Sequence, residues 1–290
     1  MKVLPYIILP LLSLNAVSQQ SAHPLKIKST RITHPIAKNP MKAGPETNAL
    51  NTKNYNTLYQ YGTAESFVGG LFEANLPVAD LLKHGDFGIG APGLLDGELV
   101  VYNGQAYQSQ ATGKTAAVPG SFKTALAFVT FFKPDTTFHI SAALNQKEAL
   151  AQLEQYVSHK NSAYAIKISG KFSYLKTRAF PPYTQKPYPP LATLLDRQKF
   201  FDIRNTSGVI IGYKLPPYLN GLSIEGYHFH FLSDQKDQGG HVLDFAGGEL
   251  TVEIAKIQTF ILSIPQDEDF MQYNFKSNIH NDLEKVEKGH

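Results

Sequence analysis

Cysteine is absent from the 290-residue sequence, and its absence removes several kinds of chemistry at once. Without a thiol, the chain has no cysteine nucleophile, no zinc-thiolate site and no iron-sulfur cluster held by cysteine. Disulfide bonds are excluded as well, so the fold must depend on its core and on any metal that it binds. A metal site in this chain must therefore be built from histidine, aspartate and glutamate.

The sequence also lacks a large excess of charge of either sign. Lysine and arginine number 27 against 24 aspartates and glutamates, which gives a formal net charge of +3. There is no concentrated basic stripe of the kind typical of nucleic-acid-binding proteins, so we expect no nucleic-acid partner. The chain is long enough for one large domain or two modest ones with a sizeable core.

Long apolar runs are missing after the first residues. A positive charge at Lys2 precedes an apolar stretch over residues 3–17, and small residues at 16–18 follow the pattern of a cleavage site. The stretch is too short to favour a membrane-spanning helix, although an uncleaved anchor is the alternative interpretation. We expect residues 1–18 to be a signal peptide of a secreted or periplasmic protein that has no membrane association after cleavage.

The next residues predict a leader followed by helices and a β-meander. Residues 19–54 are rich in Lys, Pro, Asn, Thr and Ser and have little periodicity, which predicts an exposed leader. Apolar spacing of three and four predicts helices over 64–72 and 78–82, ahead of the first strands. Asp96-Gly97 and Asn103-Gly104 are two-residue hairpin signals that bracket a strand.

A helix is predicted to separate two halves of the chain. Residues 146–157 have helical spacing, and Asn145 is a suitable N-cap. We therefore expect an N-terminal α/β domain over residues 55–158 and a C-terminal domain over residues 159–290. Each half mixes strands and helix, which indicates an α/β fold with α+β character.

Short strands separated by glycines are expected in the second half. A turn at Ser169-Gly170 is predicted to divide strands at 164–168 and 172–180, and later strands are expected at 242–245 and 250–254. The proline- and tyrosine-rich segment 181–190 is interpreted as a rigid active-site loop.

The most informative stretch is Gly-Tyr-His-Phe-His-Phe at residues 226–231, followed by Gly-Gly-His at residues 239–241. In a strand, His228 and His230 project from one face because side chains repeat every two residues. A hairpin would return His241 to their side. Three neutral imidazoles with a vacant coordination position are typical of a catalytic metal site.

Other interpretations of the histidines were weighed. A single histidine on an apolar strand is ordinarily packed and hydrogen-bonded, but burying three unpaired imidazoles within fourteen residues would be costly. Cupin-type metalloenzymes also use His-x-His with a later histidine, yet the glutamate and glycine spacings after His230 differ. A non-enzymatic exported metal-binding protein is the alternative from another class.

Several ordered segments resemble α-acetolactate decarboxylases, over about residues 57–289. The similar segments are 81–90, 95–99, 131–135, 164–166, 177–178, 186–188, 226–231 and 239–245. One departure is Ala91-Pro92, where the family usually has Thr-Phe.

The resemblance implies a two-domain α/β protein with mixed sheets, commonly a homodimer, with a zinc site in the C-terminal half. It implies conversion of (S)-2-acetolactate to (R)-acetoin and carbon dioxide, with zinc or another divalent metal and no organic cofactor. The positions that match the family's metal-binding histidines are His228, His230 and His241, and those that match its other active-site residues are Glu98, Arg178 and Glu287.

Roles for the three non-histidine residues follow from the chemistry that the resemblance implies. Arg178 would orient the substrate's anionic and carbonyl oxygens, and Glu98 would hold the hydroxyl proton or protonate carbon. The C-terminal tail is predicted to fold over the site and bring Glu287 to the metal. Asp234 and Asp244 are candidates for a hydrogen bond to a ligand imidazole.

Overall fold

The computed structural model describes residues 53–275 and 280–288, and residues 51–290 group as one compact unit. The expected signal peptide, and the expected leader up to residue 52, lie outside the described residues. Within the described residues, no helix is both long and apolar enough to cross a membrane.

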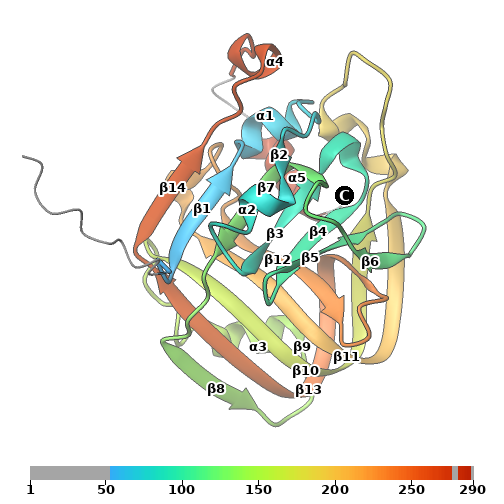
Figure 1. The fold of residues 1–290 in the computed structure, drawn as a ribbon. Coiled ribbons are helices and arrows are strands. Elements are labelled where there is room, and N and C mark those ends of the chain that lie inside the picture. Colours follow the sequence, from blue (N-terminus) through green and yellow to red (C-terminus); the bar gives the residue numbers. More distant parts are fainter. Residues whose placement is uncertain (1–52, 276–279, 289–290) are drawn as a thin grey trace, which may run out of the picture. The chain divides into compact units, whose positions relative to one another are not determined.

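An eight-stranded sheet is built mainly from the first half of the chain (Figure 1). Its strand order is β14-β1-β7-β3-β4-β5-β6, and β2 pairs with β7. Strands β1 and β14 are parallel and the other pairs are antiparallel, so the sheet is mixed. The strands are β1 (Thr57–Tyr61), β2 (Leu76–Pro77), β3 (Phe87–Pro92), β4 (Glu98–Tyr102), β5 (Gln105–Ser109), β6 (Thr115–Ala117), β7 (Lys123–Thr130) and β14 (Thr259–Ser263).

A six-stranded antiparallel sheet contains the longest strands (Figure 1). Its order is β10-β11-β12-β13-β8, with β9 on β13 and an additional pairing of β10 with β13. Strands β10, β11, β12 and β13 therefore form a closed ring of pairings. The strands are β8 (Thr136–Ile140), β9 (Leu144–Asn145), β10 (Ala163–Ala179), β11 (Lys199–Leu215), β12 (Gly226–Ser233) and β13 (Gly239–Ile257).

The helices are short. The best-capped one is α3, where the Asn145 side chain accepts from the Glu148 amide and the Glu148 carboxylate accepts from the Asn145 amide. This capping box confirms the predicted helix start. The helices are α1 (Ala64–Val68), α2 (Val78–Leu81), α3 (Gln146–Leu153), α4 (Glu268–Met271) and α5 (His280–Lys288), and the 3₁₀ turns are η1 (Gly93–Leu95), η2 (Leu191–Thr193), η3 (Leu195–Arg197) and η4 (Pro217–Leu219).

The expected fold class is confirmed: strands and short helices are mixed in both halves, and the first sheet is itself mixed. The expected order of helices before strands is wrong, because β1 precedes α1. Asn103 and Gly104 form the predicted two-residue turn between β4 and β5, with φ of 52° and 76°. Positive φ at both positions is what a type I′ hairpin requires.

The predicted interruptions of the long strands are wrong. No turn separates two strands at Gly170, because β10 continues through it with a register shift against β13. Gly170 has φ +148°, and an added Cβ would lie 2.5 Å from the Glu249 carbonyl oxygen, so glycine allows the bulge without ending the strand. Strand β13 likewise runs through the glycines at 247–248, since its backbone groups pair with β10 there.

The division expected at residue 158 stays a prediction. The sheets themselves divide elsewhere: β8 and β9 precede that point yet pair with β13, and β14 follows it yet pairs with β1. A hydrophobic cluster drawn from both sheets packs them together. Tyr213 crosses this cluster, and its hydroxyl lies 3.3 Å from the carbonyl oxygens of both Phe87 and Phe128. Tyr213 of β11 lies directly opposite His228 of β12, so its contacts fix this part of the second sheet to the first sheet.

Candidate metal centre

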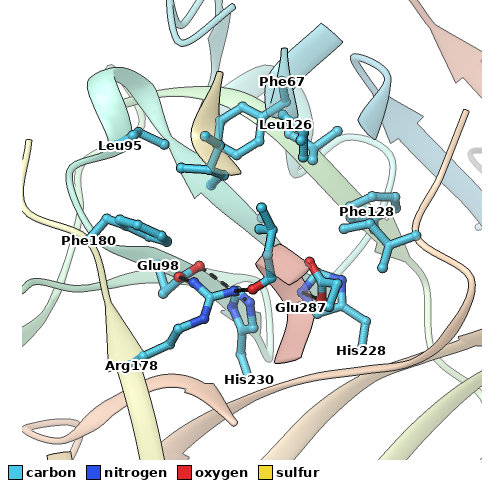
Figure 2. A pocket seen from close by; sticks show the side chains of 17 residues that line it. Phe67, Leu95, Glu98, Leu126, Phe128, Arg178, Phe180, His228, His230 and Glu287 are labelled. Carbon is cyan, nitrogen blue, oxygen red and sulfur yellow. Dashed lines mark hydrogen bonds and ion pairs between the residues drawn. The ribbon is translucent and has the colours of Figure 1, made fainter. Parts of the chain in front are cut away.

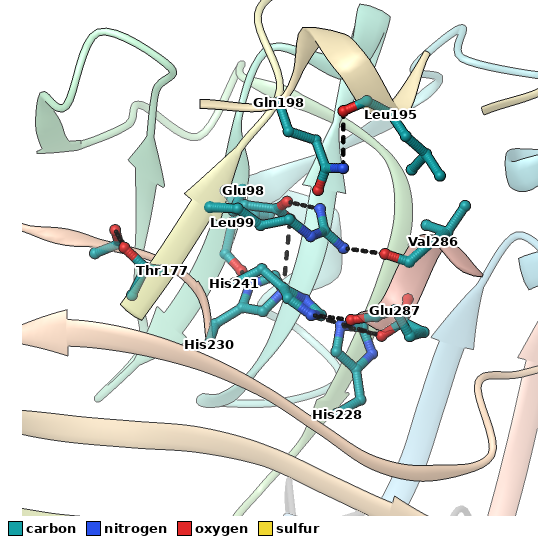
Figure 3. A network of polar contacts seen from close by, with 12 residues as sticks. Glu98, Leu99, Thr177, Leu195, Gln198, His228, His230, His241, Val286 and Glu287 are labelled. Carbon is teal, nitrogen blue, oxygen red and sulfur yellow. Dashed lines mark hydrogen bonds and ion pairs between the residues drawn. The ribbon is translucent and has the colours of Figure 1, made fainter. Parts of the chain in front are cut away.

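The three histidines meet where β12 turns into β13. His228 and His230 lie two residues apart on β12, and the ladder places His230 directly opposite His241. One ligand atom from each ring lies within 4.8 Å of the other two. Ring centroids are separated by 5.0 to 5.4 Å. The hairpin therefore brings together the three imidazoles that the sequence spacing singles out (Figure 3).

Burial keeps these imidazoles neutral. Burial and, to a lesser extent, the nearby Arg178 guanidinium together lower the pKa of His228 to about 3. Burial also places the pKa values of His230 and His241 well below the usual histidine value, and neighbouring positive groups act in the same direction. A neutral imidazole offers a nitrogen lone pair to a metal ion without first releasing a proton.

The orientation of His230 is set by a backbone carbonyl. Its Nδ1 lies 2.9 Å from the Leu99 carbonyl oxygen, which can only accept, so Nδ1 carries the proton. Its Nε2 is buried and has no hydrogen-bond partner among the residues that the structure describes. Asp234 and Asp244, the predicted partners for a ligand imidazole, are both exposed. The sequence could not reveal the Leu99 carbonyl as the partner of His230, because every residue has a backbone carbonyl.

Glu287 reaches the histidines from helix α5. Its Oε2 lies 3.7 Å from His228 Nε2 and 3.8 Å from His241 Nε2, and its backbone carbonyl lies 3.3 Å from the same His241 nitrogen (Figure 3). Within the described part of the chain, Oε2 is buried without a hydrogen-bond partner. Burial raises the pKa of Glu287 to about 7, although Arg178 acts in the opposite direction.

Glu98 and Arg178 form a buried ion pair beside the histidines. Arg178 Nη1 donates to Glu98 Oε1 at 3.0 Å, and the two side chains are only 4% and 9% exposed, respectively. Glu98 Oε2 lies 3.5 Å from His230 Nε2. Burial raises the pKa of Glu98 to about 8, Arg178 opposes this rise, and Glu287 adds to it. Arg178 is also directly opposite His241 in the β10–β13 ladder.

An apolar hollow adjoins the polar groups. Figure 2 shows Glu98, Arg178, His230, His228 and Glu287 on one side of it and apolar side chains on the other. The apolar lining comprises Phe67, Val68, Ala91, Leu95, Leu126, Phe128, Phe180, Leu191, Ile224 and Val286. Such a wall suits a small substrate with methyl groups, and low polarity strengthens the electrostatic interactions inside.

The donor set fits a divalent cation of the zinc type. Three neutral imidazoles and one carboxylate are ligands that zinc prefers, and about 3.3 Å separates neighbouring ligand atoms in an ideal tetrahedral site. The carboxylate-to-imidazole separations of 3.7 and 3.8 Å approach that value. The unpartnered, buried His230 Nε2 and Glu287 Oε2 would be costly without such an ion.

Three further histidines in the described part of the chain, His84, His139 and His159, lie apart from this cluster, as expected. His84 stacks on Tyr59, with ring centroids 3.8 Å apart. His139 is exposed on β8, and His159 Nδ1 lies 3.5 Å from the Tyr164 hydroxyl. The side chains of the other four, at positions 23, 34, 280 and 290, are outside the described residues.

The expected active-site loop does not line the hollow. Residues 181–190 contribute none of its lining side chains, whereas the flanking Phe180 and Leu191 do. Sequence reasoning also missed the apolar wall contributed by α1. The apolar spacing around Phe67 was the available signal for this wall. Core packing explains that spacing equally well.

Comparisons with known proteins identify the family of the chain. Residues 58–277 match the family model described as alpha-acetolactate decarboxylase. The enzyme of that name from Methanosarcina mazei is 38% identical over 233 residues, which cover 80% of each chain. Its counterpart from Bacillus subtilis strain 168 is 32% identical over 231 residues, covering 79% of this chain and 90% of that one.

Solved structures show the same fold. The crystal structure of alpha-acetolactate decarboxylase from Bacillus subtilis strain 168 superposes with a TM-score of 0.77 at 31% identity, covering 80% of this chain and 99% of that chain. A Staphylococcus aureus protein described as similar to alpha-acetolactate decarboxylase gives a TM-score of 0.76 at 31% identity, covering 81% and 100%. The chain belongs to the alpha-acetolactate decarboxylase family, whose members are carboxy-lyases.

Proposed function

We propose that the protein catalyses zinc-dependent decarboxylation of (S)-2-acetolactate to (R)-acetoin and carbon dioxide. The observation that carries this proposal is a cluster of three neutral imidazoles, of which His228 and His230 line one apolar hollow together with two carboxylates. The imidazole-rich ligand set suits zinc better than magnesium or calcium, which prefer oxygen ligands, and zinc is a Lewis acid without redox chemistry. A non-enzymatic metal-binding protein would need neither Glu98 nor Arg178 beside the histidines.

The reaction breaks the bond between the carboxylate carbon and C2 of acetolactate. The bonding electron pair moves toward the adjacent ketone, giving carbon dioxide and an enediolate, and C2 then takes up one proton to give acetoin. A divalent cation held by the three histidines and Glu287 would supply a Lewis acid for the substrate's ketone and hydroxyl oxygens. The protein groups must then supply orientation and the proton.

Glu98 is the best-placed proton donor. Burial raises its pKa to about 8, toward the neutral range, so this carboxyl group can exchange a proton with the substrate while its Oε1 accepts the hydrogen bond from Arg178. Its position is fixed by the strand β4 backbone and by Arg178. Delivery of the proton from one fixed side of the hollow would yield a single enantiomer of acetoin.

Arg178 and the apolar wall would orient the substrate. The guanidinium lines the hollow and provides a positive charge for the substrate's anionic carboxylate. The methyl groups would pack on the opposite wall, near Phe67 and Leu126 (Figure 2). Ala91 also lines this wall, so the departure from the family's usual threonine leaves an apolar surface there.

The test is acetoin formation from racemic acetolactate by purified protein, analysed on a chiral column. We expect rapid conversion of the (S) enantiomer to (R)-acetoin, loss of activity after treatment with a chelator, and recovery with zinc. Folded, zinc-loaded protein that released no acetoin would contradict the proposed activity. Full activity in protein shown by elemental analysis to be free of metal would contradict the zinc requirement alone.

We also propose that the protein is exported and forms a homodimer. Export is supported by the sequence of residues 1–18, and the dimer by the family resemblance. N-terminal sequencing of protein from its native host should place cleavage after Ser18, and light scattering on the purified protein should give twice the chain mass. An intact N-terminus and a monomer mass would overturn these two proposals separately.

A further inference from the structure

We infer that Arg178 is a positioning residue that locates helix α5, and through it Glu287, at the metal centre. Its Nη2 donates to the Val286 carbonyl oxygen at 3.1 Å. Its Nη1 donates to Glu98 (Figure 2). One guanidinium thus joins a strand of the first sheet to the last turn of the C-terminal helix. This role is additional to orienting the substrate, and its effect on metal binding rests on the proposed zinc site.

Helix α5 needs such an anchor because it is short. Nine residues are too few for an isolated helix to be stable in water, so α5 depends on docking. Leu283 and Val286, one turn apart, are 5% and 3% exposed and join the hydrophobic cluster between the sheets. These two side chains hold the helix against its neighbours. Polar contacts then set its rotation about the helix axis and its position along that axis.

The Val286 carbonyl is a suitable point of attachment. It is among the last four carbonyls of α5, which lack partners within the helix. A cation at this end of a helix is also favoured by the helix dipole. The next residue is Glu287, so fixing the Val286 carbonyl fixes the backbone position from which the Glu287 carboxylate extends toward His228 and His241.

Arg178 is itself held rigidly. Its side chain is 4% exposed, and its guanidinium carbon lies 5.2 Å from the centre of the Phe180 ring. A planar guanidinium can donate to Glu98 and to Val286 at the same time, whereas a lysine ammonium at the end of a flexible chain cannot reproduce both directions. Arg178→Lys therefore removes the attachment while keeping the positive charge near the metal.

The experiment measures zinc affinity by competition with a chelator and amide hydrogen exchange in the metal-free, full-length protein. We expect Arg178→Lys to weaken zinc binding about tenfold and to speed exchange of the last-turn amides, residues 284–288, at least tenfold, without affecting β10 or β11. Lys285→Ala, at an exposed position of the same helix, is the control and should change zinc affinity less than about twofold.

A double-mutant comparison separates this role from direct contact with substrate or metal. If Arg178 acts through Glu287, Arg178→Lys should weaken zinc binding less than about threefold when Glu287 is already Gln. Additive losses in the two variants would overturn the inference. So would a folded Arg178→Lys protein that kept normal zinc affinity and α5 exchange but had a raised KM, because that pattern identifies a substrate contact alone.

If Arg178→Lys does not fold, a second variant tests whether the hydrogen bond from Arg178 to the Val286 carbonyl positions α5. An ester in place of the peptide bond between Val286 and Glu287, introduced with a synthetic C-terminal segment, keeps every side chain but weakens the carbonyl as an acceptor. We expect severalfold weaker zinc binding and faster exchange in α5, and unchanged values would overturn the inference. If the wild-type protein bound no zinc, the proposed function would fail, whereas the exchange rates would still test the attachment of α5.

Discussion

The two carboxylates of the site are supported in opposite ways. Glu98 begins β4, in the interior of the eight-stranded sheet, and its backbone pairs with Ser109 of the next strand. Glu287 lies in the last turn of a nine-residue helix that is held by two buried side chains, the Arg178 contact and the contact of the Glu287 carbonyl with His241. A ladder of backbone hydrogen bonds fixes Glu98, whereas a small docking surface fixes Glu287.

The comparison indicates which half of the site is pre-formed. Glu98 and the three histidines lie on strands whose positions are set by the folding of the two sheets. Glu287 completes the site only when α5 is docked. Local opening of a short docked helix requires less free energy than opening of a sheet. The position of Glu287, the helix side of the site, should therefore be more sensitive to remote substitutions than the positions of Glu98 and the three histidines, the strand side.

The largest effect is expected on the strand side. His230→Ala removes a buried ligand, and we expect zinc affinity to fall by roughly three orders of magnitude, about 4 kcal/mol, with almost complete loss of turnover. His139→Ala, on the exposed face of β8, is the control and should retain both. Normal zinc content in folded His230→Ala protein would show that the metal lies elsewhere.

The next effect concerns the helix side. Glu287→Gln keeps the size of the side chain but removes its charge, so we expect turnover and zinc affinity to fall roughly 10- to 100-fold. Glu284→Gln, one turn earlier and exposed, should change turnover less than about twofold. Steady-state kinetics on both variants makes the comparison. Equal losses would mean that general charge on α5, and not the position of Glu287, controls the rate.

A smaller effect is expected in the protons released on zinc binding. The three imidazoles are neutral because burial lowers each pKa, and they release none near pH 6. The Glu287 pKa is raised to about 7, so its carboxyl group is mostly protonated at pH 6 and must ionise to bind a cation. Calorimetry in buffers of different ionisation enthalpy should show about one proton released at pH 6 and close to none at pH 8.5. Release at pH 6 that persisted in Glu287→Gln would assign the proton to another group.

The smallest effect is expected far from both carboxylates. Asn145→Ala removes the capping box of α3 and should lower the free energy of unfolding by about 1 kcal/mol. Zinc affinity should not change, because α3 supplies no ligand. Denaturant unfolding and chelator competition measure the two quantities. A parallel loss of zinc affinity would mean that the strand side is less rigid than its ladders suggest.

Sequence reasoning was most successful where function and local geometry coincide. The two-residue spacing of His228 and His230 needs only a strand to bring the rings to one face, and the following hairpin returns His241. The N-cap at Asn145 and the turn at Asn103-Gly104 depend on short-range contacts alone. Such features can be predicted because neighbouring residues determine them.

Features determined by distant parts of the chain were missed. Strands β10 and β13 continue through glycines because the backbone of each strand pairs with the backbone of the other over many residues. The orientation of His230 depends on the Leu99 carbonyl, 131 positions away in the sequence. The docking of α5 was predicted from family resemblance, since Leu283 and Val286 alone are too weak a pattern to distinguish a docked helix from a frayed end.

The parallel pairing of β1 with β14 has a consequence for how the protein is made. Thr57 pairs with Thr259, so β1 must wait for a strand that is synthesised 202 residues later. At ribosomal rates of roughly 5 to 20 residues per second, that delay is roughly 10 to 40 s. During this interval one edge of β1 is open to pairing with other chains. The nascent protein should therefore depend on chaperones more than its compact final fold suggests, and slower translation should increase that dependence.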